Sequence, residues 1–292
     1  DDLPSLRDII NNDSKRKIIA LSQNPAVQVK GLFIAPPGNI WTGFNTTYEG
    51  ENRAFQKVKI PIYLNDKVSD IDSIVTIIKN EKNETIQRLV KKNLDEGLNY
   101  VDWKLDEEIV SLQGSWINEE SRGIPVLPGL YKVEFNYKNE TIQSEIKVIP
   151  DPRFELDENV DENLFSFQKR VVKQVKRLNT IFNELNEIQK KIKISRLSVQ
   201  RKKKLTAELN KIQLKTRHQL KDRQLGAWES NKITAYSVLR NVIKFSRARL
   251  RNPSAQDESL LSMAKELVGE IERDIIDFKN KRKKELNSMK LN

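Results

Sequence analysis

Apolar and polar residues alternate along much of the first half of the chain. From Tyr131 to Tyr137 every second residue is apolar, and the alternation resumes at Ile142 after a turn at Lys138–Glu140. A period of two places apolar side chains on one face of a strand and polar ones on the other, as in an antiparallel sheet over one core. The pattern predicts seven short strands at Val27–Ile34, Val58–Leu64, Ser73–Lys79, Glu84–Lys91, Tyr100–Leu105, Tyr131–Tyr137 and Ile142–Ile149. Strands of this number and length, without intervening helices, indicate an immunoglobulin-like or fibronectin-like β-sandwich.

The period changes to three or four residues near Asp157. From Leu164 to Ile192 the apolar residues lie on one stripe of a helix of about 35 residues, or about 50 Å. Ser254 and Asp257 form the sequence pattern of a capping box at the start of the last helix. The further apolar stripes lie at 205–216, 233–243 and 260–278. Together they predict an antiparallel bundle of three or four helices.

The predicted fold class is therefore α+β in two domains. We expect residues 1–24 to be a linker from an upstream domain, 25–150 the β-sandwich domain, 151–156 a proline-rich joint and 157–292 the helical bundle. Proline has no N–H group and restricts the residue before it. Pro150, Asp151, Pro152 and Arg153 are accordingly predicted to form a stiff interdomain joint, with Arg153 pairing with an acidic residue at the domain junction.

The basic charge is confined to the second half. Residues 1–153 carry 20 Lys or Arg against 23 Asp or Glu, whereas residues 154–292 carry 32 against 18, and the whole chain has a net charge of +11. The chain has no cysteine, which excludes disulfides and thiolate chemistry. No apolar run approaches the 18 or more residues of a membrane span, so no transmembrane segment is predicted.

The basic runs Arg201–Lys204 and Lys279–Lys284 are the sharpest electrostatic features of the second half. Acidic residues occur throughout the same predicted helices, a mixture typical of solvated outer faces rather than of specific nucleic-acid binding. Attraction of this basic face to an acidic membrane surface or an acidic glycan is the alternative, which would make it a polyanion-binding face.

Candidate catalytic groups are few. The carboxylates of Asp106–Glu108 could serve in glycosidic acid/base chemistry if a cleft held them about 5–10 Å apart, but a solvated loop is favoured. His218, the single histidine, is interpreted as a surface or interhelix residue. No glycine loop for a phosphate and no metal-ligand spacing is present. We therefore predict a noncatalytic segment without cofactor or metal, with Trp41 and Trp116 as possible surface contacts in loops.

Several stretches, in order, resemble a known family. "DDLPSLRDI" (Asp1–Ile9), "YEGENRAFQKVKIPIYL" (Tyr48–Leu64), "DEGLNYVDWKL" (Asp95–Leu105) and "GIPVLPGLYKVEF" followed by "VIPDPR" (Gly123–Arg153) are similar to segments of bacterial, Bacteroidetes-type sortilin-like β-propeller proteins. These proteins are often labelled glycosyl hydrolases with BNR repeats. The similar segments belong to the region that follows the family's propeller, and they are structural signatures rather than catalytic ones.

The resemblance implies an exported, extracytoplasmic protein of the cell envelope, cell surface or secreted fraction. It implies an upstream β-propeller in the same chain and an outer-membrane or cell-surface protein partner. The present chain is then a structural and protein-interaction module that buttresses the propeller and docks on an envelope partner. The alternatives are an accessory part of a secreted hydrolase whose site lies in the propeller, and a polyanion-binding helical bundle.

Overall fold

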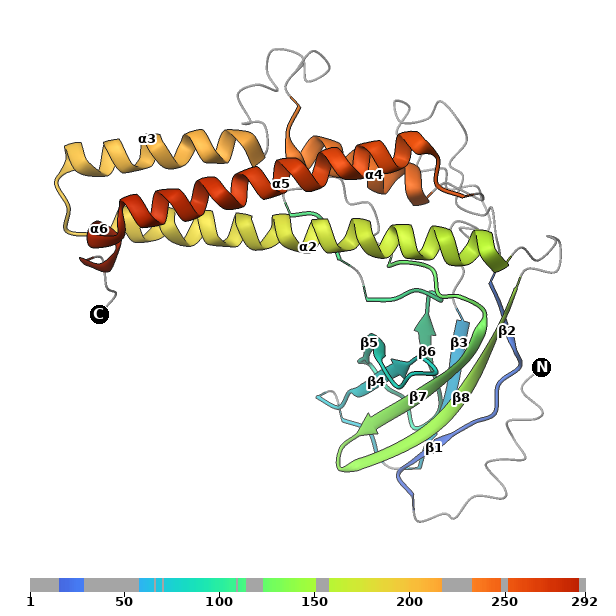
Figure 1. The fold of residues 1–292 in the computed structure, drawn as a ribbon. Helices are drawn as coiled ribbons and strands as arrows, with labels where there is room; N and C mark the ends of the chain where they lie inside the picture. The colour runs from blue at the N-terminus through green and yellow to red at the C-terminus, as the bar shows by residue number, and fades with distance from the viewer. Residues whose placement is uncertain are drawn as a thin grey trace, which may run out of the picture. The chain divides into compact units, whose positions relative to one another are not determined.

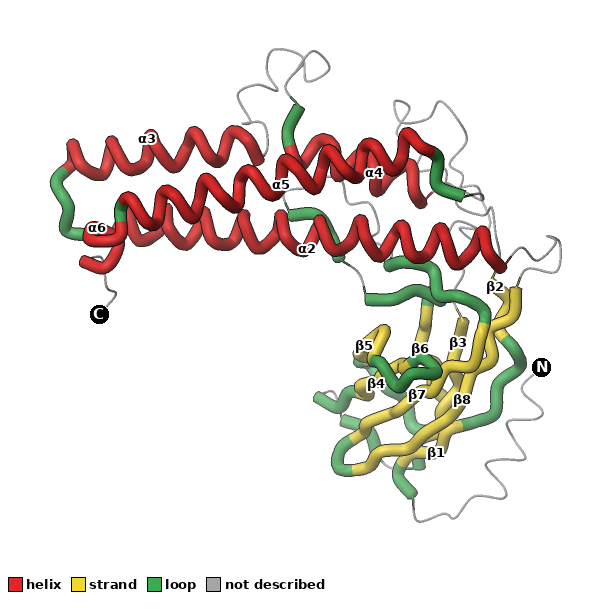
Figure 2. The backbone as a smooth tube through the Cα atoms, in the orientation of Figure 1, coloured by secondary structure: helices red, strands yellow, loops and turns green. Residues whose placement is uncertain are grey.

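The computed structural model describes residues 16–28, 58–65, 67–69, 71–108, 110–113, 123–150, 158–216, 233–247 and 252–288. It is an α+β protein, as predicted. The chain divides into two compact units, which we name the strand unit (residues 1–109 and 122–165) and the helical unit (residues 110–121 and 166–292). Figure 1 labels the helices and strands of the chain, and Figure 2 shows the same backbone coloured by secondary structure.

The described strands of the strand unit form two sheets. The first has three antiparallel strands in the order β1 (Ile18–Ala20), β3 (Val58–Leu64) and β6 (Gly97–Trp103). The second has five strands in the order β2 (Ala26–Gln28), β8 (Glu140–Pro150), β7 (Gly129–Tyr137), β4 (Ile74–Lys79) and β5 (Thr85–Lys91). Only the β2–β8 pair among these described strands is parallel.

Both sheets contribute to one hydrophobic core. Ile60 and Trp103 of the first sheet belong to the same buried cluster as Ile78 and Phe135 of the second. The alternation that predicted β7 is confirmed, since Val133, Phe135 and Tyr137 are fully buried. Burial of large apolar side chains such as these contributes about 1.5–3 kcal/mol each relative to exposure.

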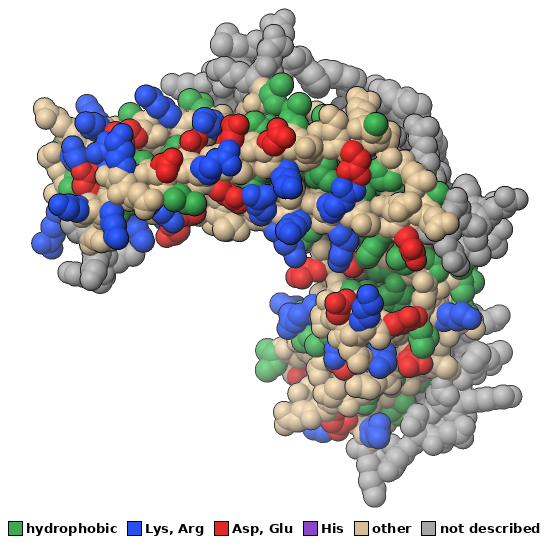
Figure 3. Space-filling view, in the orientation of Figure 1, with side chains coloured by type: hydrophobic (Ala, Val, Ile, Leu, Met, Phe, Trp, Pro, Cys, Tyr) green, Lys and Arg blue, Asp and Glu red, His purple; other side chains and the backbone are tan. Residues whose placement is uncertain are grey.

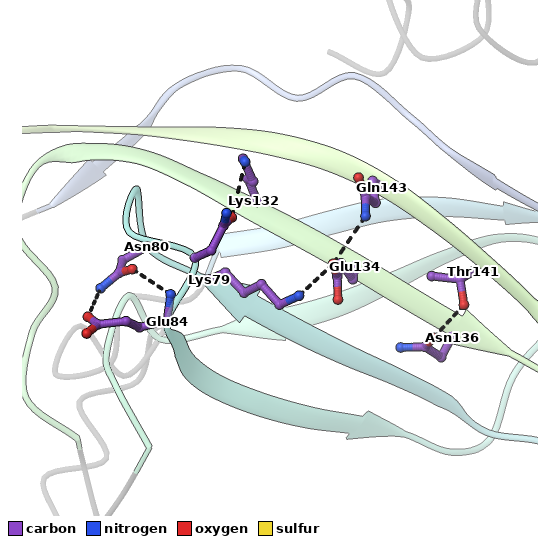
Figure 4. Close-up of polar contacts among 9 residues, drawn as sticks. Lys79, Asn80, Glu84, Lys132, Glu134, Asn136, Thr141 and Gln143 are labelled. Carbon is purple, nitrogen blue, oxygen red and sulfur yellow. Dashed lines mark hydrogen bonds and ion pairs between the residues drawn. The ribbon is translucent and has the colours of Figure 1, made fainter.

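The polar positions of the same alternation form cross-strand contacts on the other face of the larger sheet (Figure 4). Glu134 of β7 accepts from Lys79 Nζ of β4 at 2.7 Å and from Gln143 Nε2 of β8 at 3.1 Å. Two residue pairs further along, Thr141 Oγ1 donates to Asn136 Oδ1 at 2.7 Å. Directly opposed and diagonal pairs of this kind each stabilise a sheet by about 0.2–1 kcal/mol.

The structure differs from the predicted domain bounds at two places. Ile18–Ala20 lies within the expected linker, yet it forms β1, pairs Ile18 with Leu64 of β3 and buries Ile18 completely. A strand of three residues is too short to show an alternating pattern, so the sequence carried no sign of it. Residues 110–113, expected in the sandwich, belong instead to the helical unit, because Leu112 lies in its core.

The remaining strand predictions hold within a few residues. Val58–Leu64 is reproduced, and the strands predicted at 73–79, 84–91, 100–105, 131–137 and 142–149 occur with shifted ends. Of the strand expected at Val27–Ile34, the described part is in β2, and residues 29–34 lie outside the described residues.

The described helices are α2 (Glu158–Ile194), α3 (Val199–Thr216), α4 (Ala235–Arg247), α5 (Ala255–Lys281) and α6 (Lys283–Ser288). The predicted apolar stripes of α2 to α5 are confirmed by Leu178, Leu209, Leu239 and Val268, which lie in one buried cluster. Ile233 is the exception: it was expected to start the stripe at 233–243, but it is 64% exposed. The capping box is confirmed as well: Ser254 N donates to Asp257 Oδ2 at 2.8 Å, and Asp257 N donates to Ser254 Oγ at 3.3 Å.

Interhelical ion pairs reveal the helix directions. Arg170 of α2 pairs with Glu258 of α5, and the later residue Glu184 of α2 pairs with the later residue Lys279 of α5. The residue numbers increase in the same direction along both helices, so α2 and α5 are parallel. Between α3 and α5 the order is reversed, because Glu208 pairs with Arg282, just beyond the end of α5, whereas Lys215 pairs with the earlier residue Asp274. Helix α3 therefore runs antiparallel to α5.

Candidate functional site

Most of the residues proposed from the sequence as contacts fall outside the described residues. These are Asp151, Pro152 and Arg153 of the joint and the loop tryptophans Trp41 and Trp116. His218, interpreted as a surface or interhelix residue, also lies outside the described residues. Pro150 is described. It is the last residue of β8 and lies opposite Gln28 of β2, so the predicted joint begins only where this strand pairing ends.

The structure corrects the interpretation of Asp106. This residue was assigned to a solvated loop, yet it is only 4% exposed. Its Oδ2 accepts from the backbone N–H of Gly123 at 2.9 Å, and its Oδ1 accepts from Gln87 Nε2 at 3.3 Å. Its backbone carbonyl accepts from the indole Nε1 of buried Trp103 at 2.9 Å. We name these four residues the Asp106 anchor.

The chain on either side of Asp106 is fixed by backbone hydrogen bonds. Glu107 N donates to Ile124 O at 2.8 Å, and Val126 N donates to Leu105 O at 2.9 Å. The buried carboxylate of Asp106 needs the hydrogen bonds from Gly123 and Gln87, because leaving a polar group unsatisfied in the interior costs several kcal/mol. The Asp106 anchor thus ties the segment that precedes β7 to the segment that follows β6, which is a structural role.

A different part of the chain concentrates charge. Residues 190–204 contain eight Lys or Arg and no Asp or Glu, and residues 279–284 contain five Lys or Arg and no Asp or Glu. Blue side chains gather over the end of the helical unit formed by the start of α3, the end of α2 and α6 (Figure 3). We name residues 184–208 with 277–285 the basic end.

Contacts bring the two parts of the basic end together in space. Arg201 at the start of α3 forms an ion pair with Glu285 of α6. Arg282 Nε donates to Glu208 Oε2 at 3.0 Å. Within the basic end there are 13 Lys or Arg against five Asp or Glu, which leaves an excess of eight positive charges. Charge of one sign at this density attracts polyanions and anionic surfaces over about 8–10 Å at physiological salt.

The carboxylate of Glu208 in the basic end is partly shielded from solvent, with its side chain 28% exposed. The hydrogen bond from Arg282 lowers the pKa of Glu208 below its ordinary value, partial burial opposes that shift, and two nearby lysines add to it. Because the folded state holds this pKa below its value in the unfolded chain, the pair stabilises the protein at neutral pH. That contribution is present above the unfolded pKa and is lost as pH falls through the folded one.

We expect the Glu208–Arg282 pair to make the helical unit acid-sensitive below about pH 4. Glu208→Gln should lower the melting temperature at pH 7 and flatten its fall between pH 5 and pH 2. The control is Glu187→Gln, whose pair with Lys190 lies within one helix and leaves Glu187 57% exposed, so solvent screens it. Thermal unfolding followed by circular dichroism measures both. Equal pH profiles for Glu208→Gln and the unchanged protein would contradict the assignment.

In the described part of the chain, no three His, Cys, Asp or Glu residues are grouped so that they could hold a metal ion. None of the described helices is both long and apolar enough to cross a membrane. Comparison of the chain with models of protein families and with curated proteins finds no match.

Proposed function

We propose that the chain is a noncatalytic interaction module whose basic end docks on an acidic partner. In this proposal the strand unit is an immunoglobulin-like or fibronectin-like β-sandwich, supported by two sheets that share one core. The helical unit is a bundle in which α3 reverses the direction of α2 and α5, supported by the order of the interhelical ion pairs.

The observation that carries the proposal is the concentration of charge at the basic end. Two stretches that are far apart in sequence supply it: the end of α2 with the start of α3, and the end of α5 with α6. Repulsion among so many like charges destabilises a compact fold, and only part of it is relieved by the ion pairs of Arg201 and Arg282. An acidic partner would relieve the remainder.

The wider setting of the proposal rests on the family resemblance in the sequence. It places the chain after the β-propeller of an exported, sortilin-like protein, with the strand unit buttressing the propeller and an outer-membrane or cell-surface component as partner. The joint Pro150–Arg153 and the loop tryptophans Trp41 and Trp116 keep their proposed roles as orienting and contact residues.

An accessory role in a hydrolase is the weaker alternative. It would draw on the carboxylates of Asp106–Glu108, and the buried, hydrogen-bonded state of Asp106 supports a structural role for that residue instead.

The proposal is tested by the salt concentration at which the chain elutes from immobilised heparin, used as a generic polyanion. One variant changes Lys191, Lys193, Lys203 and Lys283 of the basic end to serine. A matched control changes Lys59, Lys92, Lys132 and Lys147 of the strand unit to serine, so both variants lose the same charge.

We expect the basic-end variant to elute at markedly lower salt and the control close to the unchanged chain. Each phosphate-like contact that is lost reduces the slope of log K against log salt by about one. Equal elution of the two variants would show that net charge alone governs binding and would overturn the assignment of the basic end as the docking surface.

A further inference from the structure

The turn between α2 and α3 exposes two large aliphatic side chains in the middle of the basic end. Ile194, the last residue of α2, is 60% exposed, and Val199, the first residue of α3, is 70% exposed. Ile194 lies two residues beyond buried Ile192 and therefore points away from the apolar stripe of α2. Leu197, between them, packs instead against the helical core.

Hydrogen bonds hold the backbone of this turn in one conformation. Ser195 N and Oγ donate to the carbonyls of Lys191 and Ile192 at 3.0 and 2.7 Å, which completes the end of α2. Ser198 directly precedes α3, and its carbonyl accepts from Lys202 N at 3.0 Å. Lys202 Nζ crosses the turn and donates to Lys193 O at 2.9 Å. The two aliphatic side chains are thus presented by a pre-organised tip, which reduces the entropy lost on binding.

Cationic side chains surround the tip in sequence and in space. Lys190, Lys191 and Lys193 precede it, Arg196 lies within it, and residues 201–204 follow it. The basic residues 281–284 lie beside it, since Arg201 pairs with Glu285. An apolar centre ringed by Lys and Arg matches the chemistry of a lipid interface, where acyl chains lie directly beneath anionic headgroups.

We propose that the basic end binds lipid bilayers that contain anionic headgroups, with Ile194 and Val199 entering the interface and the surrounding lysines and arginines contacting the headgroups. This inference rests on the proposed docking function and names its partner. An acidic polymer would satisfy the lysines but would leave the two aliphatic side chains in water. A bilayer satisfies both.

The test is sedimentation of the chain with vesicles of phosphatidylcholine containing phosphatidylglycerol, against vesicles of phosphatidylcholine alone. Ile194→Ser with Val199→Ser removes the apolar centre and leaves the charge unchanged. The matched control, Leu214→Ser with Ile276→Ser, removes two exposed aliphatic side chains elsewhere on the helical unit, which are 44% and 54% exposed. Melting temperatures of all variants confirm that they are folded.

We expect binding only to the anionic vesicles, a loss of about tenfold or more in partition coefficient for the tip variant, and a change of less than about twofold for the control. A tip variant that binds anionic vesicles as well as the unchanged chain would overturn insertion. A chain whose basic end binds heparin but ignores anionic vesicles would overturn the lipid partner and leave the docking function standing. Failure of the basic end in both assays would overturn the docking function as well.

Discussion

Replacing Gly123 with alanine is expected to destabilise the strand unit by about 3 kcal/mol or more. A Cβ atom at this position would lie 1.7 Å from the carbonyl oxygen of Glu107 and 2.7 Å from its carbonyl carbon. Both are backbone atoms, and Glu107 N is itself hydrogen-bonded to Ile124 O, so neither side of the contact can withdraw without breaking the pairing of the two segments. The effect is steric, because the methyl group has no space.

Gly129→Ala provides the matched control. Its Cβ would meet only the Glu81 carboxylate at 3.4 Å and the Tyr131 ring at 4.0 Å, both of which are ordinary distances to side chains. We expect it to change the free energy of unfolding by less than about 1 kcal/mol. Urea unfolding followed by circular dichroism gives both values. An unfolding midpoint for Gly123→Ala equal to that of Gly129→Ala would refute the close approach of Gly123 to Glu107.

Removal of the Asp106 carboxylate is expected to have the second largest effect, about 3 kcal/mol for Asp106→Ala. The substitution leaves the buried N–H of Gly123 without its acceptor and takes one acceptor from the Gln87 amide, which retains Glu107 O at 3.2 Å. Asp106→Asn keeps one carbonyl oxygen and the shape of the side chain, so we expect about half that loss.

The neighbouring carboxylate supplies the reference for this series. Glu108 belongs to the same acidic run but is exposed, and Glu108→Ala should cost less than about 0.5 kcal/mol. The expected order of destabilisation by urea unfolding is therefore Asp106→Ala, then Asp106→Asn, then Glu108→Ala. If Glu108→Ala proved as damaging as Asp106→Ala, the Asp106 anchor would not be the structural link between these segments.

Local periodicity determined most of the secondary structure. Alternation at Tyr131–Tyr137 predicted β7, and the stripe from Leu164 to Ile192 predicted α2, because each period reports which side of its own element is buried. The capping box at Ser254 was equally local, since both of its partners lie within one turn of helix. These features can be recognised from neighbouring residues alone.

Contacts between distant residues decided the rest. Asp106 is buried because Gly123, 17 residues away, and Gln87, 19 residues away, reach its carboxylate. A run of three acidic residues in a loop is far more often solvated, so the sequence favoured the wrong environment. β1 is a strand only because β3 offers it a free edge, and three residues are too few to show a period.

The candidate docking surface was likewise predictable only in part from the sequence. The basic runs Arg201–Lys204 and Lys279–Lys284 were visible in the sequence, and so were the acidic residues elsewhere in the same helices. Their meeting at one end depends on α3 reversing direction against α5, which places Arg201 beside Glu285. The exposure of Ile194 and Val199 depends on the turn that joins α2 to α3. The sequence alone thus determined the residue types and the local periods of the helices and strands. The direction of each helix and the ion-pair partners of each charged residue depend on long-range packing, which local patterns do not encode.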